Sequence, residues 1–123
     1  MGDYKPATIL CSAYYDSVRR LIGGMLAGRG YNVIEVGHAK EAIPHVPSAD
    51  LVVTDVSNGG KDLYDCVRDQ RPGVKVIFIV GIDHFPEGTP EGSIVLQKPF
   101  HPAELEALVR DNLPEHLKPH DAA

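Results

Sequence analysis

The feature that most constrains this fold is the run 74–80, VKVIFIV, in which every residue except Lys75 is apolar. A short run this apolar is typical of a central strand of a parallel sheet, because helices bury such a strand on both faces. Four more apolar runs predict four more strands, at 8–12, 31–36, 50–55 and 93–96. A chain of 123 residues buries one hydrophobic core, so we expect all five strands in one sheet.

Helical patterns separate these runs, because apolar residues recur between them at spacings of three or four. The stripes are Val18, Leu21, Ile22, Met25 and Leu26; Ala39, Ala42, Ile43 and Val46, interrupted by Pro44; Leu63, Cys66 and Val67; and, after Pro102, Leu105, Leu108, Val109 and Leu113. Asp16 or Ser17 is expected to cap the first helix. Strands that alternate with helices predict an α/β fold with helices on both faces of a parallel sheet. Right-handed crossovers favour the flavodoxin-like doubly wound sheet, in strand order 2-1-3-4-5.

Two segments depart from this regular alternation. Residues 81–93, GIDHFPEGTPEGS, contain two prolines and three glycines and lack a helical apolar period. They predict a loop or one short turn where a fourth helix would stand in a complete fold of this kind. Residues 114–123 predict a polar tail after a core at 7–113, within a single domain at 1–123.

Composition and charge exclude several function classes. The formal net charge is −5, which argues against unaided binding to nucleic acid or to an anionic membrane. No apolar run approaches a membrane span, and no signal-peptide pattern opens the chain, so we expect a cytoplasmic protein. Cys11 and Cys66 lie in apolar patterns and are expected to be reduced and buried. The six histidines are expected to be solvated surface residues rather than metal ligands.

The predicted strands bring two charged residues to one edge of the sheet. Asp55 ends the third strand, and Lys98 follows the fifth. In this fold the functional crevice lies outside the carboxyl ends of the strands. An opposite charge nearby favours the ionised carboxylate. We therefore expect Asp55 to be ionised and to lie within direct or one-water reach of Lys98.

Three stretches of the chain resemble the receiver domains of two-component response regulators: LVVTDV, VLQKPF, and SVRRLIGGMLAGRGYNVIEVGHAKEAI, within a match over 7–113. The resemblance implies that Asp55 is the phosphoacceptor and Lys98 the lysine that pairs with the phosphoryl group. It implies a signalling module rather than an enzyme. Its partners would be a sensor histidine kinase or phosphotransfer protein and a downstream protein effector. A Mg²⁺ ion would be held by Asp55, by the backbone carbonyl of Ser57 and by two acids at the end of the first strand.

The sequence departs from the receiver pattern around that aspartate. The acid pair falls on Ala13 and Tyr14, and the hydroxyl position at the end of the fourth strand falls on Val80. The aromatic position on the fifth strand falls on Val95, and a position usually occupied by proline is Gly59. A hard dication needs several anionic or carbonyl oxygens, so we predict Mg²⁺ binding weaker than about millimolar. We expect Tyr14 and Tyr15 to fill the space of the missing acids and metal.

Three functions remain open from the sequence. The chain could be a competent phosphoacceptor, or a degenerate pseudo-receiver that acts by protein–protein contact, which is the reading we favour. The third is a small flavodoxin-like enzyme or ligand-binding module, with a cofactor-sized pocket lined by Tyr14, Asp55 and Lys98. That last function lacks the glycine-rich loop that would cradle a phosphate.

Overall fold

A computed structural model describes residues 6–56, 59–81, 89 and 93–118. Five parallel strands form one sheet in the order β2-β1-β3-β4-β5, which confirms the predicted flavodoxin-like topology. The strands are β1 (Thr8–Ser12), β2 (Asn32–Val36), β3 (Leu51–Asp55), β4 (Lys75–Val80) and β5 (Ile94–Gln97). Strand β4 is buried along its whole length after Lys75, as expected for a strand covered on both faces.

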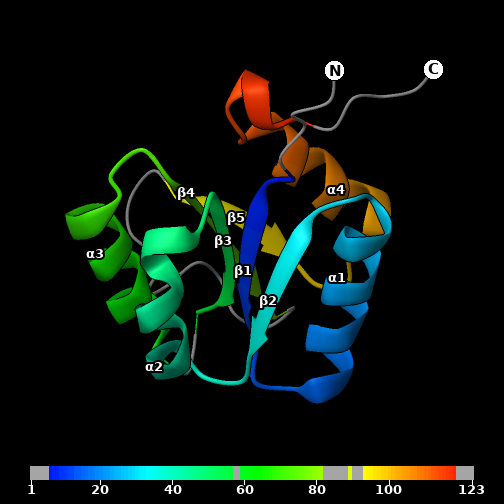
Figure 1. Ribbon diagram of the computed structural model, residues 1–123. Helices are drawn as coiled ribbons and strands as arrows, with labels where there is room; N and C mark the ends of the chain where they lie inside the picture. The colour runs from blue at the N-terminus through cyan, green and yellow to red at the C-terminus, as the bar shows by residue number, and fades with distance from the viewer. Residues whose placement is uncertain (1–5, 57–58, 82–88, 90–92, 119–123) are drawn as a thin grey trace.

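Helices cover both faces of the sheet (Figure 1). Helices α2 (Ala39–Ala42) and α3 (Gly60–Gln70) lie on one face, and α1 (Asp16–Gly28) and α4 (Pro102–Asp111) lie on the other. Each face therefore has its own layer of apolar side chains. No helix in the described ranges has the length and apolar character needed to cross a membrane.

The alternation of side chains along β3 determines where its last residue points. Leu51 and Val53 pack in the cluster under α1 and α4, whereas Val52 packs in the cluster under α2 and α3. Successive strand residues point to opposite faces, so Asp55 belongs to the α1 and α4 side of the sheet. Lys98 follows Leu96 by two residues and Leu96 packs in the same cluster, so both charged residues come to one side.

Two local predictions about the helices need correction. Tyr15, whose side chain makes no capping hydrogen bond, is the N-cap of α1, and Asp16 is the first helical residue rather than the cap. Helix α2 ends at Ala42 and continues as a 3-10 turn, η1 (Ile43–Ser48). Pro44 is the physical reason, because proline has no backbone N–H to continue the α-helical hydrogen bonds.

The described part of the predicted polar tail, residues 114–118, contains regular structure. A 3-10 turn, η2 (Glu115–Leu117), follows Pro114, and Leu117 packs against the α1 and α4 core cluster. Residues 119–123 lie outside the described residues, as do 82–88 and 90–92, so the predicted loop at 81–93 stays a prediction.

Candidate functional site

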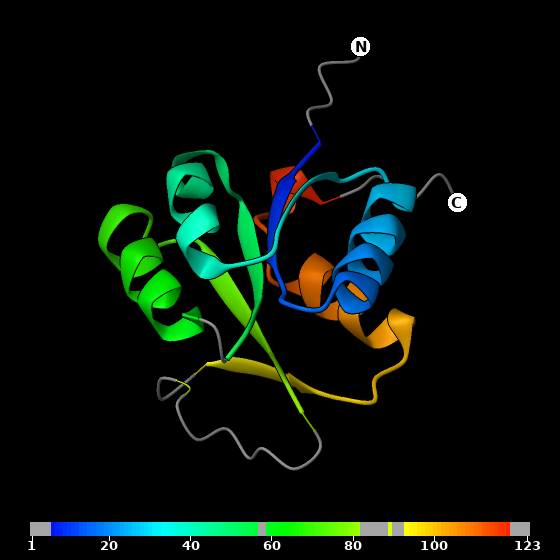
Figure 2. The same cartoon turned by 90° about the horizontal axis from the view of Figure 1, so that it is seen from below.

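The carboxyl ends of the strands meet at the edge seen in Figure 2, and Asp55 is the last residue of β3 at this edge. The backbone N–H of Tyr14 donates a hydrogen bond to Asp55 Oδ2 at 3.0 Å. The second oxygen, Oδ1, is buried and has no hydrogen-bond partner among the described residues. A buried acceptor without a partner has lost its hydrogen bonds to water and has not replaced them. Only one of the two carboxylate oxygens therefore has a hydrogen-bond partner among the described residues.

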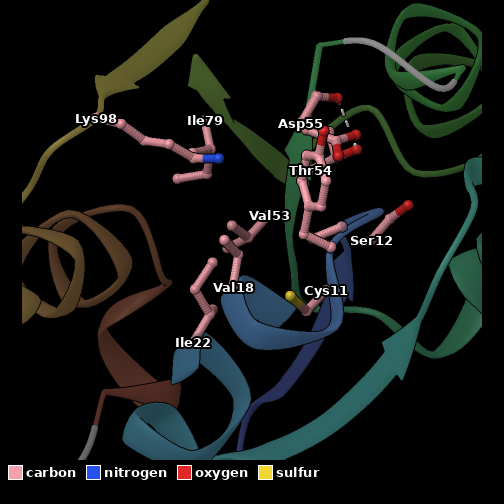
Figure 3. Close-up of a pocket in the computed structure, with 11 residues that line it drawn as sticks. Cys11, Ser12, Val18, Ile22, Val53, Thr54, Asp55, Ile79 and Lys98 are labelled. Carbon is pink, nitrogen blue, oxygen red and sulfur yellow. Dashed lines mark hydrogen bonds between the residues drawn. The ribbon is translucent and has the colours of Figure 1, made fainter. Parts of the chain in front are cut away.

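A small cavity adjoins this carboxylate, which we call the Asp55 cavity. Figure 3 shows Asp55 and Lys98 entering it from opposite sides. Its remaining wall is largely apolar, formed in part by Val18, Val53 and Ile79. The interior volume of about 10 Å³ is room for about one water molecule. A cofactor-sized ligand does not fit this cavity, and Tyr14 does not line it, so the geometry disfavours the alternative of a ligand-binding module.

The surroundings of Asp55 raise the pKa of its carboxyl above the ordinary value of 3.8. Burial is the largest cause, because it disfavours the charged form. The Tyr14 N–H and the positive charge of Lys98 act in the opposite direction but do not outweigh burial. The predicted electrostatic control by Lys98 is therefore the weaker effect, and desolvation determines the sign.

We predicted that Asp55 lies within direct or one-water reach of Lys98; the direct contact is not formed, and the one-water contact stays a prediction. Within the described ranges the two side chains make no ion pair, although both line the Asp55 cavity. Sheet order explains the separation, because β4 lies between β3 and β5, and Ile79 of β4 forms part of the wall between them. Lys98 acts on the carboxylate through space rather than through a hydrogen bond.

The residues at the acid-pair positions do not supply metal ligands. Ala13 is buried in the cavity wall, with 6% of its surface exposed, and Tyr14 reaches Asp55 only with its backbone N–H. The nearby Asp16 pairs with Arg19 instead. In the part of the chain that the structure describes, no three His, Cys, Asp or Glu side chains gather as a metal site. Ser57 lies outside it, and the donors present do not fit the implied Mg²⁺ ion.

We predicted that Tyr14 and Tyr15 fill the place of the missing acids, but both are mostly exposed, although Tyr15 lines the Asp55 cavity. The Tyr14 and Tyr15 side chains are 62% and 64% exposed, and their rings meet edge to face at 5.2 Å. With Leu21 they are the exposed large hydrophobic residues of the described ranges. The aromatic pair therefore forms part of the exposed surface beside Asp55.

Two valines, Val80 and Val95, occupy the hydroxyl and aromatic positions of the receiver pattern. Val80 is buried at the end of β4, and its carbonyl accepts a hydrogen bond from the backbone N–H of Lys98 at 2.8 Å. Val95 packs against the α2 and α3 cluster. Gly59, at the proline position, is the N-cap of α3 with φ +88°, a conformation that proline cannot adopt. The backbone at position 59 is therefore incompatible with the proline that is usual there in the receiver pattern.

Sequence reasoning missed an apolar groove next to the Asp55 cavity. This α1–α4 groove has a volume of about 450 Å³ and is lined by Val18, Leu21, Ile22, Met25, Lys98, Pro99, Phe100 and Pro102. Three of these residues, Val18, Ile22 and Lys98, also line the Asp55 cavity. Leu21 could have indicated this groove, but the sequence analysis placed it in the apolar stripe of the first helix; its side chain is 59% exposed.

The burial predicted for Cys66 also needs correction, because this residue is only half-buried.

The comparisons with known proteins point to one kind of domain. No protein-family model and no curated protein matches the chain. The structure is similar to that of a response regulator receiver protein from Sinorhizobium medicae WSM419, with 25% sequence identity and a TM-score of 0.80 over 91% of this chain and 98% of that one. The chain folds as a response-regulator receiver domain.

Two further solved structures share the fold of this receiver domain. The chemotaxis response regulator CheY4 of Vibrio cholerae is 24% identical, with a TM-score of 0.76 over 89% of this chain and all of that one (100%). NtrX from Brucella abortus is 23% identical with a TM-score of 0.80, and the match covers 89% of this chain but 26% of NtrX. The fold supports a role in two-component signalling.

Proposed function

We propose that this receiver domain is a cytoplasmic signalling module of a phosphorelay that acts by protein–protein contact rather than as an enzyme. Asp55 holds the phosphoacceptor position, and its Mg²⁺-dependent phosphorylation is impaired. The observation that carries the proposal is the convergence of Asp55 and Lys98 on one cavity at the carboxyl ends of β3 and β5, where Ala13 stands in place of an acid.

The chemistry of phosphoryl transfer supports the impairment. Charge that develops on the transferred group must be neutralised by cations and hydrogen-bond donors that are already in place. The described site offers the ammonium of Lys98 and the N–H of Tyr14. Val80 carries no hydroxyl to donate, and the carboxylate of Asp55 is itself held in apolar surroundings. The site keeps the acceptor and the lysine but lacks the oxygen ligands that would hold a dication.

The surface beside Asp55 supports action through partners. The α1–α4 groove adjoins the Asp55 cavity, and Tyr15 of the exposed Tyr14–Tyr15 pair lines that cavity. A protein seated on this surface would bury apolar area and contact residues that line the cavity. We infer that a sensor histidine kinase or phosphotransfer protein is recognised here and that a protein effector follows it in the pathway.

Intact-mass measurement after incubation with a small phosphodonor tests the proposal. Wild type and Asp55→Asn are each incubated with acetyl phosphate, with and without Mg²⁺. We expect Mg²⁺ to produce little or no gain of a phosphoryl group in either protein. A gain that requires Mg²⁺ and disappears in Asp55→Asn would show a competent receiver and would overturn the impairment.

A further inference from the structure

One peptide group at the site is held from both sides. The carbonyl oxygen of Ala13 accepts a hydrogen bond from Arg19 Nη1 at 2.9 Å. The N–H of Tyr14 donates to Asp55 Oδ2 at 3.0 Å. This carbonyl and this N–H belong to the same planar peptide unit, so the orientation of one fixes the orientation of the other. The guanidinium and the carboxylate therefore act on opposite ends of a single rigid group.

We propose that Arg19 is a positioning residue for Asp55, and that it transmits the charge state of Asp55 to α1 and to the turn between β2 and α2. Arg19 does not touch Asp55. It holds the Ala13–Tyr14 peptide so that the Tyr14 N–H is aimed at the carboxylate. The proposal goes beyond the proposed function, because it concerns the charge at position 55 whether or not a phosphoryl group is ever attached.

The surroundings of Arg19 favour a fixed guanidinium. Its side chain is only 17% exposed, and its Nη2 pairs with Asp16, the first residue of α1. The planar fork of arginine lets one nitrogen hold Ala13 while the other holds Asp16, which a lysine cannot do in the same geometry. The guanidinium also lies against the turn before α2, since a Cβ added to Gly37 would stand 3.3 Å from Arg19 Nη1. Arg19 thus joins the β1–α1 loop, α1 and the β2–α2 turn.

Charge at both ends makes the two hydrogen bonds depend on each other. The peptide dipole lies between a cation at its oxygen and an anion at its N–H, and hydrogen bonds to ionised groups are stronger than neutral ones. Each bond polarises the peptide and so strengthens the other. If Asp55 loses its charge, the peptide loses half of this support, and the hold of Arg19 on Ala13 weakens. The effect of removing Arg19 should therefore depend on the residue at position 55.

A double-mutant cycle tests this dependence. Arg19→Gln and Asp55→Asn are combined, and the hydrogen exchange of the Tyr14 amide and the urea midpoint are measured for all four proteins. We expect Arg19→Gln to speed Tyr14 exchange by roughly tenfold when Asp55 is present, the change expected when a charge-assisted hydrogen bond is lost. In the Asp55→Asn background the same substitution should have a clearly smaller effect.

The next residue provides a matched control. Arg20 is exposed on the same helix, so Arg20→Gln removes the same charge at almost the same place. It should leave Tyr14 exchange unchanged in both backgrounds. Arg19→Lys should recover part of the protection of Tyr14, because the ammonium can still donate to Ala13.

Equal effects of Arg19→Gln in both backgrounds would overturn the proposal, since Arg19 would then only hold α1 in place. If Arg19→Gln does not fold, the cycle is run with Arg19→Lys against Asp55→Asn under the same criterion. No phosphodonor is used, so failure here is distinct from failure of the proposed function.

Discussion

Replacement of Asp55 by Asn is expected to stabilise the domain at neutral pH. Asparagine keeps an oxygen that can accept the hydrogen bond from the Tyr14 N–H, the bond that holds the carboxylate among the described residues. It removes a charge from a cavity with a largely apolar wall, in which Oδ1 has no partner among the described residues. From the sequence alone we expected Asp55→Asn to be neutral or destabilising, because Asp55 was predicted to lie within direct or one-water reach of Lys98. The structure forms no direct ion pair between these two described residues.

The size of the effect follows from the charge that is removed, because the side-chain NH2 group of asparagine takes the place of the unpaired oxygen. An unpaired buried polar group costs about 1–3 kcal/mol and more when it is charged, and the half-buried carboxylate belongs at the lower end of that range. We therefore expect a gain of about 1 kcal/mol in the free energy of unfolding. With a urea slope of about 1–3 kcal/mol per molar, the midpoint should rise by roughly 0.5 M.

The gain should depend on pH in a direction fixed by the raised pKa of Asp55. A carboxyl whose pKa is higher in the folded state favours folding while it is protonated, at pH values below its unfolded pKa. This contribution is lost as the pH rises through the folded pKa. The stability difference between Asp55→Asn and wild type should thus be small at acidic pH and should grow toward neutrality.

Urea unfolding followed by circular dichroism at several pH values measures this difference. Asp65→Asn is the control for removing one negative charge, because Asp65 is exposed and its pair with Lys61, at 3.8 Å, is worth little. A lower midpoint for Asp55→Asn than for wild type at neutral pH would refute the reasoning. So would a difference that grows as the pH falls, since that would mean that Lys98 outweighs burial.

The remaining predictions concern two glycines and two cysteines. In the same urea assay, Gly60→Ala should destabilise the domain by about 1–3 kcal/mol, because the added Cβ would stand 2.1 Å from the backbone oxygen of Asp55. Gly24→Ala should instead stabilise α1 by up to about 1 kcal/mol, because a Cβ added there has nothing within 4 Å. Burial raises the pKa of Cys11 to about 12, so a thiol reagent should modify the half-buried Cys66 first. Intact mass should show that Cys11 reacts only as the domain unfolds. Early modification of Cys11 would contradict its burial.

The order of the strands in the sheet and the helices between them could be predicted from the sequence. The apolar run of β4 and the helical stripes between strands are local patterns, and right-handed crossovers leave few ways to join them, so the sheet order could be predicted. The positions of Asp55 and Lys98 at the carboxyl edge followed from the same reasoning. The absence of acids at positions 13 and 14 was also clear from the sequence, because it depends on which residues stand there and not on distances in the fold.

Only the tertiary structure decided how these residues act on one another. Whether Lys98 touches Asp55 depends on the distance between β3 and β5 across β4 and on the packing of Ile79 at the cavity wall. No local sequence pattern determines these. The outward turn of the Tyr14 and Tyr15 rings likewise depends on how α1 meets the sheet. The sign of the pKa shift at Asp55 is a difference between desolvation and attraction, and both vary with distances of a few ångströms that only folding fixes.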